Sequence, residues 1–217
     1  MNLFPEVVVV FHDVVLRACR CKKVAAESLD AFASPNFPPL AQVGTEMVVQ
    51  HSLVRARPAP APLLTFRPEM DPNILALKLV PGFALPALVA LFAQADVKAV
   101  VLELYGSGNM PRKDGLAEAV QRATARGVLV VVVSQCIRGW VDLEAYANGR
   151  QLLDAGVVSG GDMTLEACVV KLGHLFGLGL SRDKVARLVR VPLRGEVSAE
   201  LPREARFAPR LPVRAVL

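Results

Sequence analysis

The sequence predicts an α/β fold in which a parallel sheet with crossover helices follows a β-hairpin. From about residue 74, short apolar runs typical of strands alternate with segments in which apolar residues recur every three or four positions, as on one face of a helix. The first 64 residues lack this alternation and hold two valine-rich runs around His12-Asp13, followed by a proline-rich stretch. These patterns indicate a hairpin unit and a larger α/β unit.

Strand and helix patterns follow one another in order along the chain. Pro86 falls in the first turn of one expected helix, where its missing N–H costs little. Gly127 suits the C′ position that ends another helix, and Asp162 suits an N-cap. We expect strands at 7–11, 14–17, 74–79, 97–104, 128–133 and 157–158, and helices at 85–92, 116–126, 142–153, about 163–176 and 182–189.

Closely spaced prolines mark the boundary between the two units. Pro58, Pro60 and Pro62 alternate with other residues, a pattern typical of a stiff linker. We therefore predict a hairpin and loop at 1–56, a linker at 57–64, the α/β domain at 65–197 and a basic tail at 198–217. A two-stranded hairpin is marginal on its own, so we expect the strands at 7–17 to lack their sheet and to leave an unpaired edge.

The composition excludes several classes of protein. With 217 residues, 53% of them hydrophobic, the chain can bury a core without disulfides, so its four cysteines are expected to be reduced thiols. The longest apolar run is far shorter than the ~18 residues that a membrane span needs. The spacing of cysteines and histidines fits no metal site. We predict no membrane segment, no metal and no cofactor.

The net charge of +5 comes with two clusters of basic residues, one at 17–23 and one at 182–214. No RNP motif, zinc finger or P-loop accompanies them. We therefore interpret both clusters as solvated faces and predict no nucleic-acid partner.

Polar or glycine-rich turns follow three of the expected strands, at 105–111, 134–136 and 159–162. Ligands of an open parallel sheet bind outside the carboxyl ends of its strands, so these turns are candidate sites. The first turn contains Gly106 and Gly108 but has Pro111 where a dinucleotide-binding fingerprint needs its third glycine. By itself it predicts a tight turn in which Asn109 tolerates an unusual dihedral angle.

Five motifs in order are more specific than any one turn. They are Tyr105-Gly106-Ser107-Gly108-Asn109-Met110-Pro111, Ser134-Gln135-Cys136, Tyr146-Ala147-Asn148-Gly149, residues 156–167 and Leu193-Arg194-Gly195-Glu196. In this order the chain resembles the C-terminal domain of cytosolic, type I L-asparaginases, and 17–24 with 32–41 resemble the end of that family's N-terminal domain. The resemblance implies a Rossmann/flavodoxin-like parallel sheet preceded by a remnant β-hairpin of the N-terminal domain.

The resemblance implies an amidohydrolase that converts L-asparagine and water to L-aspartate and ammonia through an acyl intermediate on a threonine. The family carries its two threonines in Thr-Gly-Gly-Thr and Gly-Thr-Asp-Thr segments, and neither occurs in this sequence. Lys23 occupies the position of the family's lysine, which as a desolvated amine would be the catalytic base. Because a hydroxyl nucleophile and its activating base are both needed, we expect the chain to be inactive alone.

Three further residues are assigned by the same resemblance. Asn109 and Tyr146 would reach into the active site of a neighbouring subunit and bind substrate there; otherwise they are a turn former and a half-buried aromatic residue. Cys136 matches a cysteine of a regulatory asparagine site in bacterial relatives, where this chain has Glu103 in place of their usual arginine. Arginine donates two parallel hydrogen bonds to a carboxylate, and a carboxylate such as Glu103 cannot, so Glu103 does not favour the regulatory site. The other interpretation of Cys136 is a buried thiol.

Two functions from different classes remain open. The first is the C-terminal portion of an L-asparaginase-type amidohydrolase that acts with a second copy of the chain or with the missing N-terminal domain. The alternative is a non-catalytic dimerising or small-molecule-binding module derived from asparaginase. The sequence starts without the basic region of a signal peptide, and we expect a cytoplasmic protein in either case.

Overall fold

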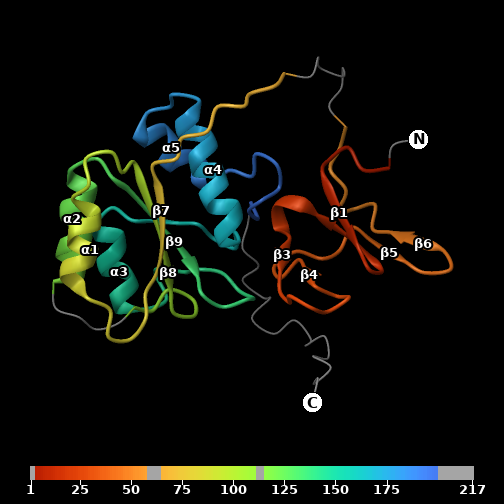
Figure 1. The fold of residues 1–217 in the computed structure, drawn as a ribbon, viewed down its shortest axis with the longest axis horizontal. Coiled ribbons are helices and arrows are strands. Elements are labelled where there is room, and N and C mark those ends of the chain that lie inside the picture. Colours follow the sequence, from red (N-terminus) through yellow and green to blue (C-terminus); the bar gives the residue numbers. More distant parts are fainter. Residues whose placement is uncertain (1–2, 58–64, 111–114, 200–217) are drawn as a thin grey trace.

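The computed structural model describes residues 3–57, 65–110 and 115–199 (Figure 1). An antiparallel sheet organises the N-terminal part of the chain, and a parallel sheet organises the rest. Most of the predicted linker at 57–64 and of the predicted tail at 198–217 lies outside the described residues, as does Pro111. No helix within the described ranges is long and apolar enough to cross a membrane.

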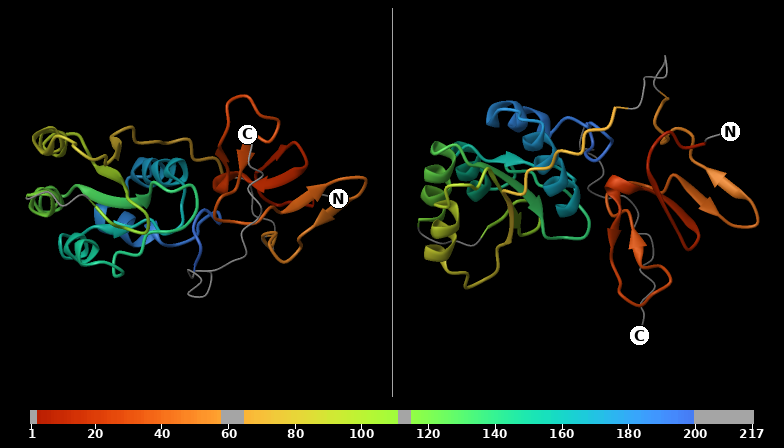
Figure 2. Two further views of the ribbon diagram at one scale, coloured as in Figure 1. Left: turned by 90° about the horizontal axis from the view of Figure 1, so that it is seen from below. Right: turned by 45° about the horizontal axis from the view of Figure 1, so that its top comes forward.

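The parallel sheet confirms the α/β prediction. Its strands are β7 (Ile74–Lys78), β8 (Ala99–Leu104), β9 (Leu129–Ser134) and β10 (Val158–Ser159), in the spatial order β10-β9-β8-β7. The helices α1 (Leu85–Phe92), α2 (Leu116–Ala125) and α3 (Ala147–Asp154) connect these strands along one face. The other face is covered by α4 (Leu165–Gly177) and α5 (Arg182–Val189), as Figures 1 and 2 show.

The central strands β8 and β9 are buried on both faces, which explains their nearly unbroken apolar sequences. Val100 and Leu102 pack with α1, α2 and α3, whereas Ala99 and Val101 pack with α4 and α5. Successive side chains of a strand point to opposite faces, so both layers need an apolar residue at every second position. The two packed layers hold the carboxyl ends of β8 and β9 at one edge of the sheet.

Helix α3 begins later than predicted, at Ala147 instead of residue 142. The carboxylate of Asp142 accepts the N–H of Glu144 at 3.0 Å, and the carbonyl of Asp142 accepts the N–H of Ala145 at 3.2 Å. These local bonds form a turn that competes with the first helical turn. The predicted helix at 142–153 is therefore wrong at its N-terminal end.

The N-cap of α4 is Thr164, so the prediction of Asp162 was wrong. Thr164 Oγ1 accepts the N–H of Ala167 at 3.1 Å, which satisfies one of the free donors at the start of the helix. Asp162 is 4% exposed and is bound instead to residues distant in the sequence. Its carboxylate accepts from Arg20 and from Ser198.

The N-terminal sheet contains the predicted hairpin and two further strands. The strands β1 (Val8–Phe11) and β2 (Val14–Arg17) turn at His12, whose φ is 53°. β2 also pairs with β5 (Ala41–Val43), which pairs with β6 (Met47–Val49), in the order β1-β2-β5-β6. The expectation that the hairpin lacks its sheet was therefore wrong for β2, whose second edge is paired with β5.

A short connection carries the chain from β2 toward the α/β unit. It consists of a 3-10 turn (Ala18–Arg20), β3 (Lys22–Lys23) and β4 (Phe32–Ala33), and the two strands pair with each other. This connection lies between the antiparallel sheet and α4 (Figure 2). It therefore carries Lys22 and Lys23 to the boundary between the two units.

Candidate functional site

A cavity of about 220 Å³ lies where the carboxyl end of β9 and the N-terminus of α4 meet the N-terminal part of the chain. This is the edge of the sheet at which ligands of open parallel sheets bind. Its polar lining combines residues from both units and includes Lys22, Asn36, Lys78, Glu103, Cys136 and Thr164. The cavity is the first candidate for a ligand site.

Buried polar contacts hold the two units together beside this cavity. Arg20 Nη1 donates to Asp162 Oδ2 at 2.8 Å, and Arg20 Nε donates to the Gly195 carbonyl at 2.6 Å. Asn36 Nδ2 donates to the Asp162 carbonyl at 2.9 Å, and Asn36 Oδ1 accepts the N–H of Gly139 at 2.8 Å. These bonds fix the position of the segment that carries Lys22 and Asn36.

Two members of the basic cluster at 17–23 are buried, which corrects the prediction of a solvated face. Arg17 Nε pairs with Glu6 Oε2 at 2.5 Å, and both side chains are at most 7% exposed. The Arg17 guanidinium also lies over the Phe37 ring, 4.3 Å from its centre. An arginine is buried at such a position only with a partner for its charge, and here Glu6 and Asp162 provide it for Arg17 and Arg20.

Charged groups of both signs line the cavity. Lys78 on β7 is the register partner of Glu103 on β8. Lys22 Nζ lies 3.2 Å from Glu166 Oε1, and both side chains are partly exposed.

Cys136 and Glu103 line the same cavity, and Cys136 is exposed. The interpretation of Cys136 as a buried thiol was wrong, because the thiol lies beyond the end of β9 and not within the core.

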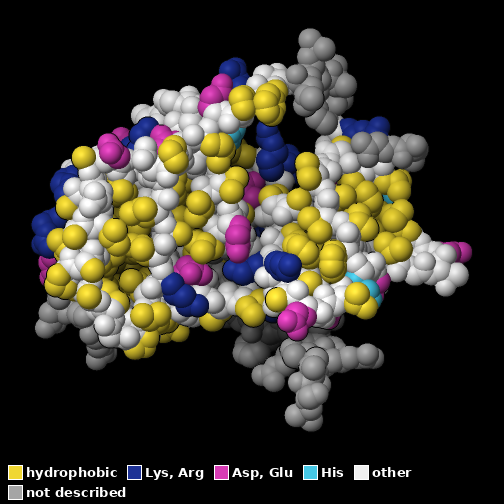
Figure 3. All heavy atoms as spheres, in the orientation of Figure 1, with side chains coloured by type: hydrophobic (Ala, Val, Ile, Leu, Met, Phe, Trp, Pro, Cys, Tyr) yellow, Lys and Arg dark blue, Asp and Glu magenta, His cyan; other side chains and the backbone are white. Residues whose placement is uncertain are grey.

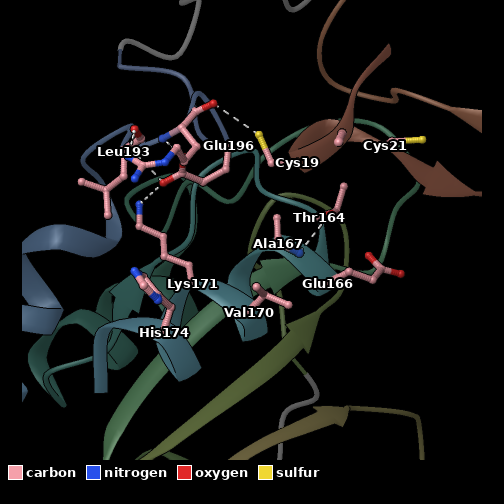
Figure 4. Close-up of a pocket in the computed structure, with 12 residues that line it drawn as sticks. Cys19, Cys21, Thr164, Glu166, Ala167, Val170, Lys171, His174, Leu193 and Glu196 are labelled. Atoms are coloured by element: carbon pink, nitrogen blue, oxygen red, sulfur yellow. Dashed lines mark hydrogen bonds and ion pairs between the residues drawn. The ribbon is translucent and has the colours of Figure 1, made fainter. Parts of the chain in front are cut away.

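A second cavity, of about 380 Å³, lies on the neighbouring side of α4 (Figure 4). Cys19 and Cys21 line it from the N-terminal part of the chain, and Lys171 and His174 line it from α4. Lys171 Nζ lies 2.6 Å from Glu196 Oε1 and donates to the carbonyls of Val189 at 2.8 Å and Val191 at 2.6 Å. All three ammonium hydrogens have acceptors within the protein, so Lys171 clamps the segment after α5 to α4 and has no donor left for a ligand.

Burial controls the protonation of this clamp. Burial lowers the pKa of Lys171 below the usual lysine range, although Glu196 partly opposes the shift. Burial by itself raises the pKa of Glu196, but the bonds from Lys171 and from the Arg194 N–H outweigh it, and the pKa lies below its usual range. This pair was not predicted from the sequence. Its signal was a lysine between Cys168 and Leu172 on the apolar face of a helix.

The cysteine next to the clamp is not an activated thiol. Cys19 Sγ donates to the Arg194 carbonyl at 3.4 Å. Burial raises the pKa of the Cys19 thiol, and the charge of Glu196 raises it further. A raised pKa lowers the population of the thiolate, which is the nucleophilic form.

Lys23 lies on β3, outside both cavities as the described residues line them. Its side chain is exposed, and its ammonium lies 5.8 Å from the centre of the Phe32 ring. The desolvated setting expected of a catalytic base is therefore not formed by the described residues alone. The role of Lys23 as a base stays a prediction.

Asn109 is hydrogen-bonded to the first turn of α3, the helix that Tyr146 precedes. The turn after β8 is closed by paired backbone bonds between Tyr105 and Asn109, at 2.8 and 2.9 Å. Gly106 and Gly108 take the positive φ angles, of 52° and 126°, so the prediction of an unusual dihedral angle at Asn109 was wrong. Asn109 Oδ1 accepts from Asn148 Nδ2 at 3.4 Å, and Asn148 follows Tyr146, the 48% exposed N-cap of α3.

Comparisons with known proteins agree over both units. The family model described as Glutaminase/Asparaginase C-terminal domain matches residues 73–189, and the model described as Asparaginase, N-terminal matches residues 1–55. L-asparaginase 1 of Escherichia coli K12 is 35% identical over 199 residues, which are 90% of this chain and 57% of that protein. The 60 kDa lysophospholipase of Homo sapiens is 40% identical over 197 residues, 90% of this chain and 34% of that protein.

A solved structure of similar sequence has the same fold. L-asparaginase I from Vibrio cholerae superposes with a TM-score of 0.82 at 34% identity, covering 90% of this chain and 58% of the other. The chain thus spans between a third and three fifths of the length of the relatives that it matches.

Proposed function

This chain belongs to the asparaginase family, and from that premise we propose that it is the C-terminal portion of an L-asparaginase-type amidohydrolase. The reaction would convert L-asparagine and water to L-aspartate and ammonia. One observation carries the proposal. The segments that resemble the family's two domains are docked through the buried Arg20–Asp162 pair, so Lys22 lines the cavity at the sheet edge where ligands bind and Lys23 lies next to it on β3.

The proposed site needs a nucleophile that the residues of this sequence do not supply. This sequence lacks the threonine segments of the family, so a neighbouring chain or domain would supply the nucleophile. Cover from that polypeptide would also desolvate the exposed Lys23 and favour its neutral, basic form. Asn109 and Tyr146 would bind the substrate of a neighbouring subunit. We place this assembly in the cytoplasm, as the resemblance to cytosolic enzymes suggests.

The 220 Å³ cavity supports the alternative, a non-catalytic small-molecule-binding module. Glu103, Lys78 and Cys136 line it, and their charges of both signs suit a small zwitterion better than an apolar ligand. Under this alternative the chain would bind L-asparagine or a similar amino acid without turnover, whether or not a second polypeptide is present.

Ammonia release from L-asparagine separates the two functions. We expect no turnover from the purified chain, and turnover when a separately expressed N-terminal domain of an L-asparaginase is added. In that mixture, Lys23→Ala should lower turnover by ~10²- to 10⁴-fold through loss of the base. The matched control is Lys184→Ala, which removes an exposed lysine on α5 and should leave turnover unchanged. Release by the chain alone that disappears on Lys23→Ala would overturn the proposal.

A mixture of two variants tests whether the site is shared between subunits. Asn109→Ala should weaken substrate capture by ~1.5 to 3 kcal/mol, the cost of a lost hydrogen bond to a charged group. If Lys23 and Asn109 act in one site from different subunits, mixed assemblies of the two variants contain some intact sites and recover part of the turnover. Turnover no better than the average of the two variants contradicts a shared site.

A further inference from the structure

The 380 Å³ cavity along α4 has a lining that suits an apolar ligand with one charged group. Its volume falls within the range of small-molecule sites, which are mostly apolar with a few placed polar groups. The apolar part of its lining consists of Ala18, Cys19, Cys21, Ala167, Val170 and Leu193. Val170 is 57% exposed, so a ligand with an aliphatic chain would remove apolar surface from water here.

The walls of this cavity are fixed by bonds within the chain. Cys19 Sγ donates to the Arg194 carbonyl at 3.4 Å, which joins the 3-10 turn to the segment after α5. Glu196 accepts the N–H groups of Leu193 at 3.1 Å and of Arg194 at 2.6 Å. It also pairs with Lys171, which holds the same segment to α4. A cavity with fixed walls needs little ordering when a ligand enters it.

Most charged side chains around the cavity are paired with each other, and the unpaired charge is positive. Lys171 is paired with Glu196, and Glu166 Oε1 lies 3.2 Å from Lys22 Nζ. Within the described ranges the Arg194 guanidinium donates only to the carbonyl of the residue before it, at 3.0 Å, and no carboxylate forms an ion pair with it. Figure 3 shows basic side chains along the junction of the two units. The cavity therefore favours an anionic group over a cationic one.

The groups that can bind an anion lie toward one end of the cavity. His174 follows Lys171 by one turn on the same face of α4, and its ring has no hydrogen-bond partner among the described residues. The Arg194 N–H is bound to Glu196, the partner of Lys171, so Arg194 belongs to the same end. Figure 4 shows His174 at this end and Ala167 nearer to the start of the helix.

We propose that this cavity binds an unbranched aliphatic monocarboxylate such as octanoate, with its carboxylate at Arg194 and its chain along α4 over Ala167. The rise along α4 from Ala167 to His174 is about 10 Å, close to the length of extended octanoate. The His174 ring can donate a second hydrogen bond to the carboxylate. The Lys22–Glu166 pair separates this cavity from the 220 Å³ cavity, since Lys22 lines one and Glu166 lines the other. This binding therefore does not depend on the proposed asparaginase reaction.

Isothermal titration calorimetry of the full chain with octanoate, below its micelle concentration, tests the site. We expect saturable binding of a single octanoate by each chain. Each buried methylene should tighten binding about fourfold, so hexanoate should bind about 15-fold more weakly. Octylamine, which carries the opposite charge, should bind much more weakly than octanoate. Absence of saturable octanoate binding, or an equal affinity for octanoate and either of the other two molecules, overturns the proposal.

Two variants test the orientation of the ligand. Arg194→Ala should weaken octanoate binding by about fivefold, the upper range for an exposed ion pair. Arg187→Ala is the matched control, because Arg187 is exposed on α5 and does not line the cavity. Ala167→Trp fills the cavity and should abolish binding, with an unchanged circular dichroism spectrum to show that the fold is kept. Equal octanoate affinity in the two arginine variants contradicts a carboxylate at Arg194.

Thiol alkylation locates the ligand within the chain. Cys19 lines this cavity and Cys136 lines the 220 Å³ cavity, so one reagent reports on both. Octanoate at about ten times its dissociation constant should slow the reaction of Cys19 with N-ethylmaleimide about tenfold, because only the ligand-free chain reacts. The reaction of Cys136, followed in the same sample by peptide mass spectrometry, should keep its rate. Slowing at Cys136 as large as at Cys19, or larger, contradicts binding in the cavity along α4.

Discussion

Arg20 and Asp162 are 142 residues apart in the sequence, yet Arg20 Nη1 lies 2.8 Å from Asp162 Oδ2, with side chains only 2% and 5% exposed. Ser198 completes the contact, because its N–H and its hydroxyl both donate to the Asp162 carboxylate, at 2.8 and 2.6 Å. The pair joins the N-terminal part of the chain to the start of α4. It therefore fixes the position of the segment that resembles the family's N-terminal domain relative to the C-terminal α/β domain.

Breaking this pair should destabilise the fold strongly. Arg20→Met leaves the Asp162 carboxylate buried without its counter-charge, and the free energy of unfolding should fall by ~3 to 5 kcal/mol. Urea denaturation followed by circular dichroism measures the loss. Asp183→Asn is the control, because the 72% exposed Asp183 pairs with Arg182 at the surface and should change stability by less than ~1 kcal/mol. Similar losses for both variants would contradict the role of burial.

The capping bond of Thr164 should have a measurable effect on stability. Thr164→Ala removes the acceptor for the Ala167 N–H, at a cost of ~0.5 to 2 kcal/mol. Ser181 is the N-cap residue of α5 but makes no side-chain capping bond, so Ser181→Ala should cost less. Urea midpoints of the two variants give the comparison. An equal effect would show that Thr164 does not stabilise α4 through this bond.

Close packing at Gly177 should make even one methyl group destabilising. A Cβ at Gly177 would lie 2.5 Å from the Glu69 carbonyl oxygen and 2.8 Å from the Met70 nitrogen. Neither backbone atom can rotate away, so Gly177→Ala should cost ~1 to 3 kcal/mol, which outweighs the gain in helix propensity of about 1 kcal/mol or less. Gly44→Ala is the control, since its nearest atom is 3.6 Å away. A Gly177→Ala protein as stable as the wild type would contradict this close contact.

Stability should depend on the protonation of Glu196 in acid. The pKa of Glu196 in the fold lies below its ordinary value of 4.5, so its contribution is complete above that value and is lost as the pH falls through the lower, folded value. Glu196→Gln should be less stable at neutral pH but should show a shallower loss of stability from about pH 5 downward. Urea midpoints measured against pH test this, with the exposed Glu27→Gln expected to keep the wild-type slope.

Much of the secondary structure was predictable because it depends on local patterns. Helix α5 was predicted with the bounds Arg182 to Val189 that the structure has, and β8 and β9 were recognised from apolar runs that two packed layers require. The turn at His12 between β1 and β2 was also predicted. Hydrophobic periodicity is a property of neighbouring residues, so it needs no knowledge of the rest of the fold.

The residues of the candidate site could be predicted from the sequence, but their contacts and their exposure could not. The family motifs indicated Asn109, Tyr146, Cys136 and Lys23, but not that Asn148 would bond to Asn109 or that Cys136 would share a cavity with Glu103. Nor could they indicate that Lys23 would be exposed among the described residues. Exposure of a side chain depends on which distant segments cover it.

The sequence by itself therefore determined most elements of the α/β unit, their order and the family, while the tertiary structure decided the pairing of the short strands β3 to β6 and the environment of the charged residues. Arg20 was assigned to a solvated basic cluster and Lys171 was not singled out, yet both are buried because Asp162 and Glu196 are brought to them from elsewhere in the chain. Asp162 was predicted to cap a helix because its partner Arg20 is distant in the sequence. The free energy of a buried charge depends on its partner, and only the folded chain brings such partners together.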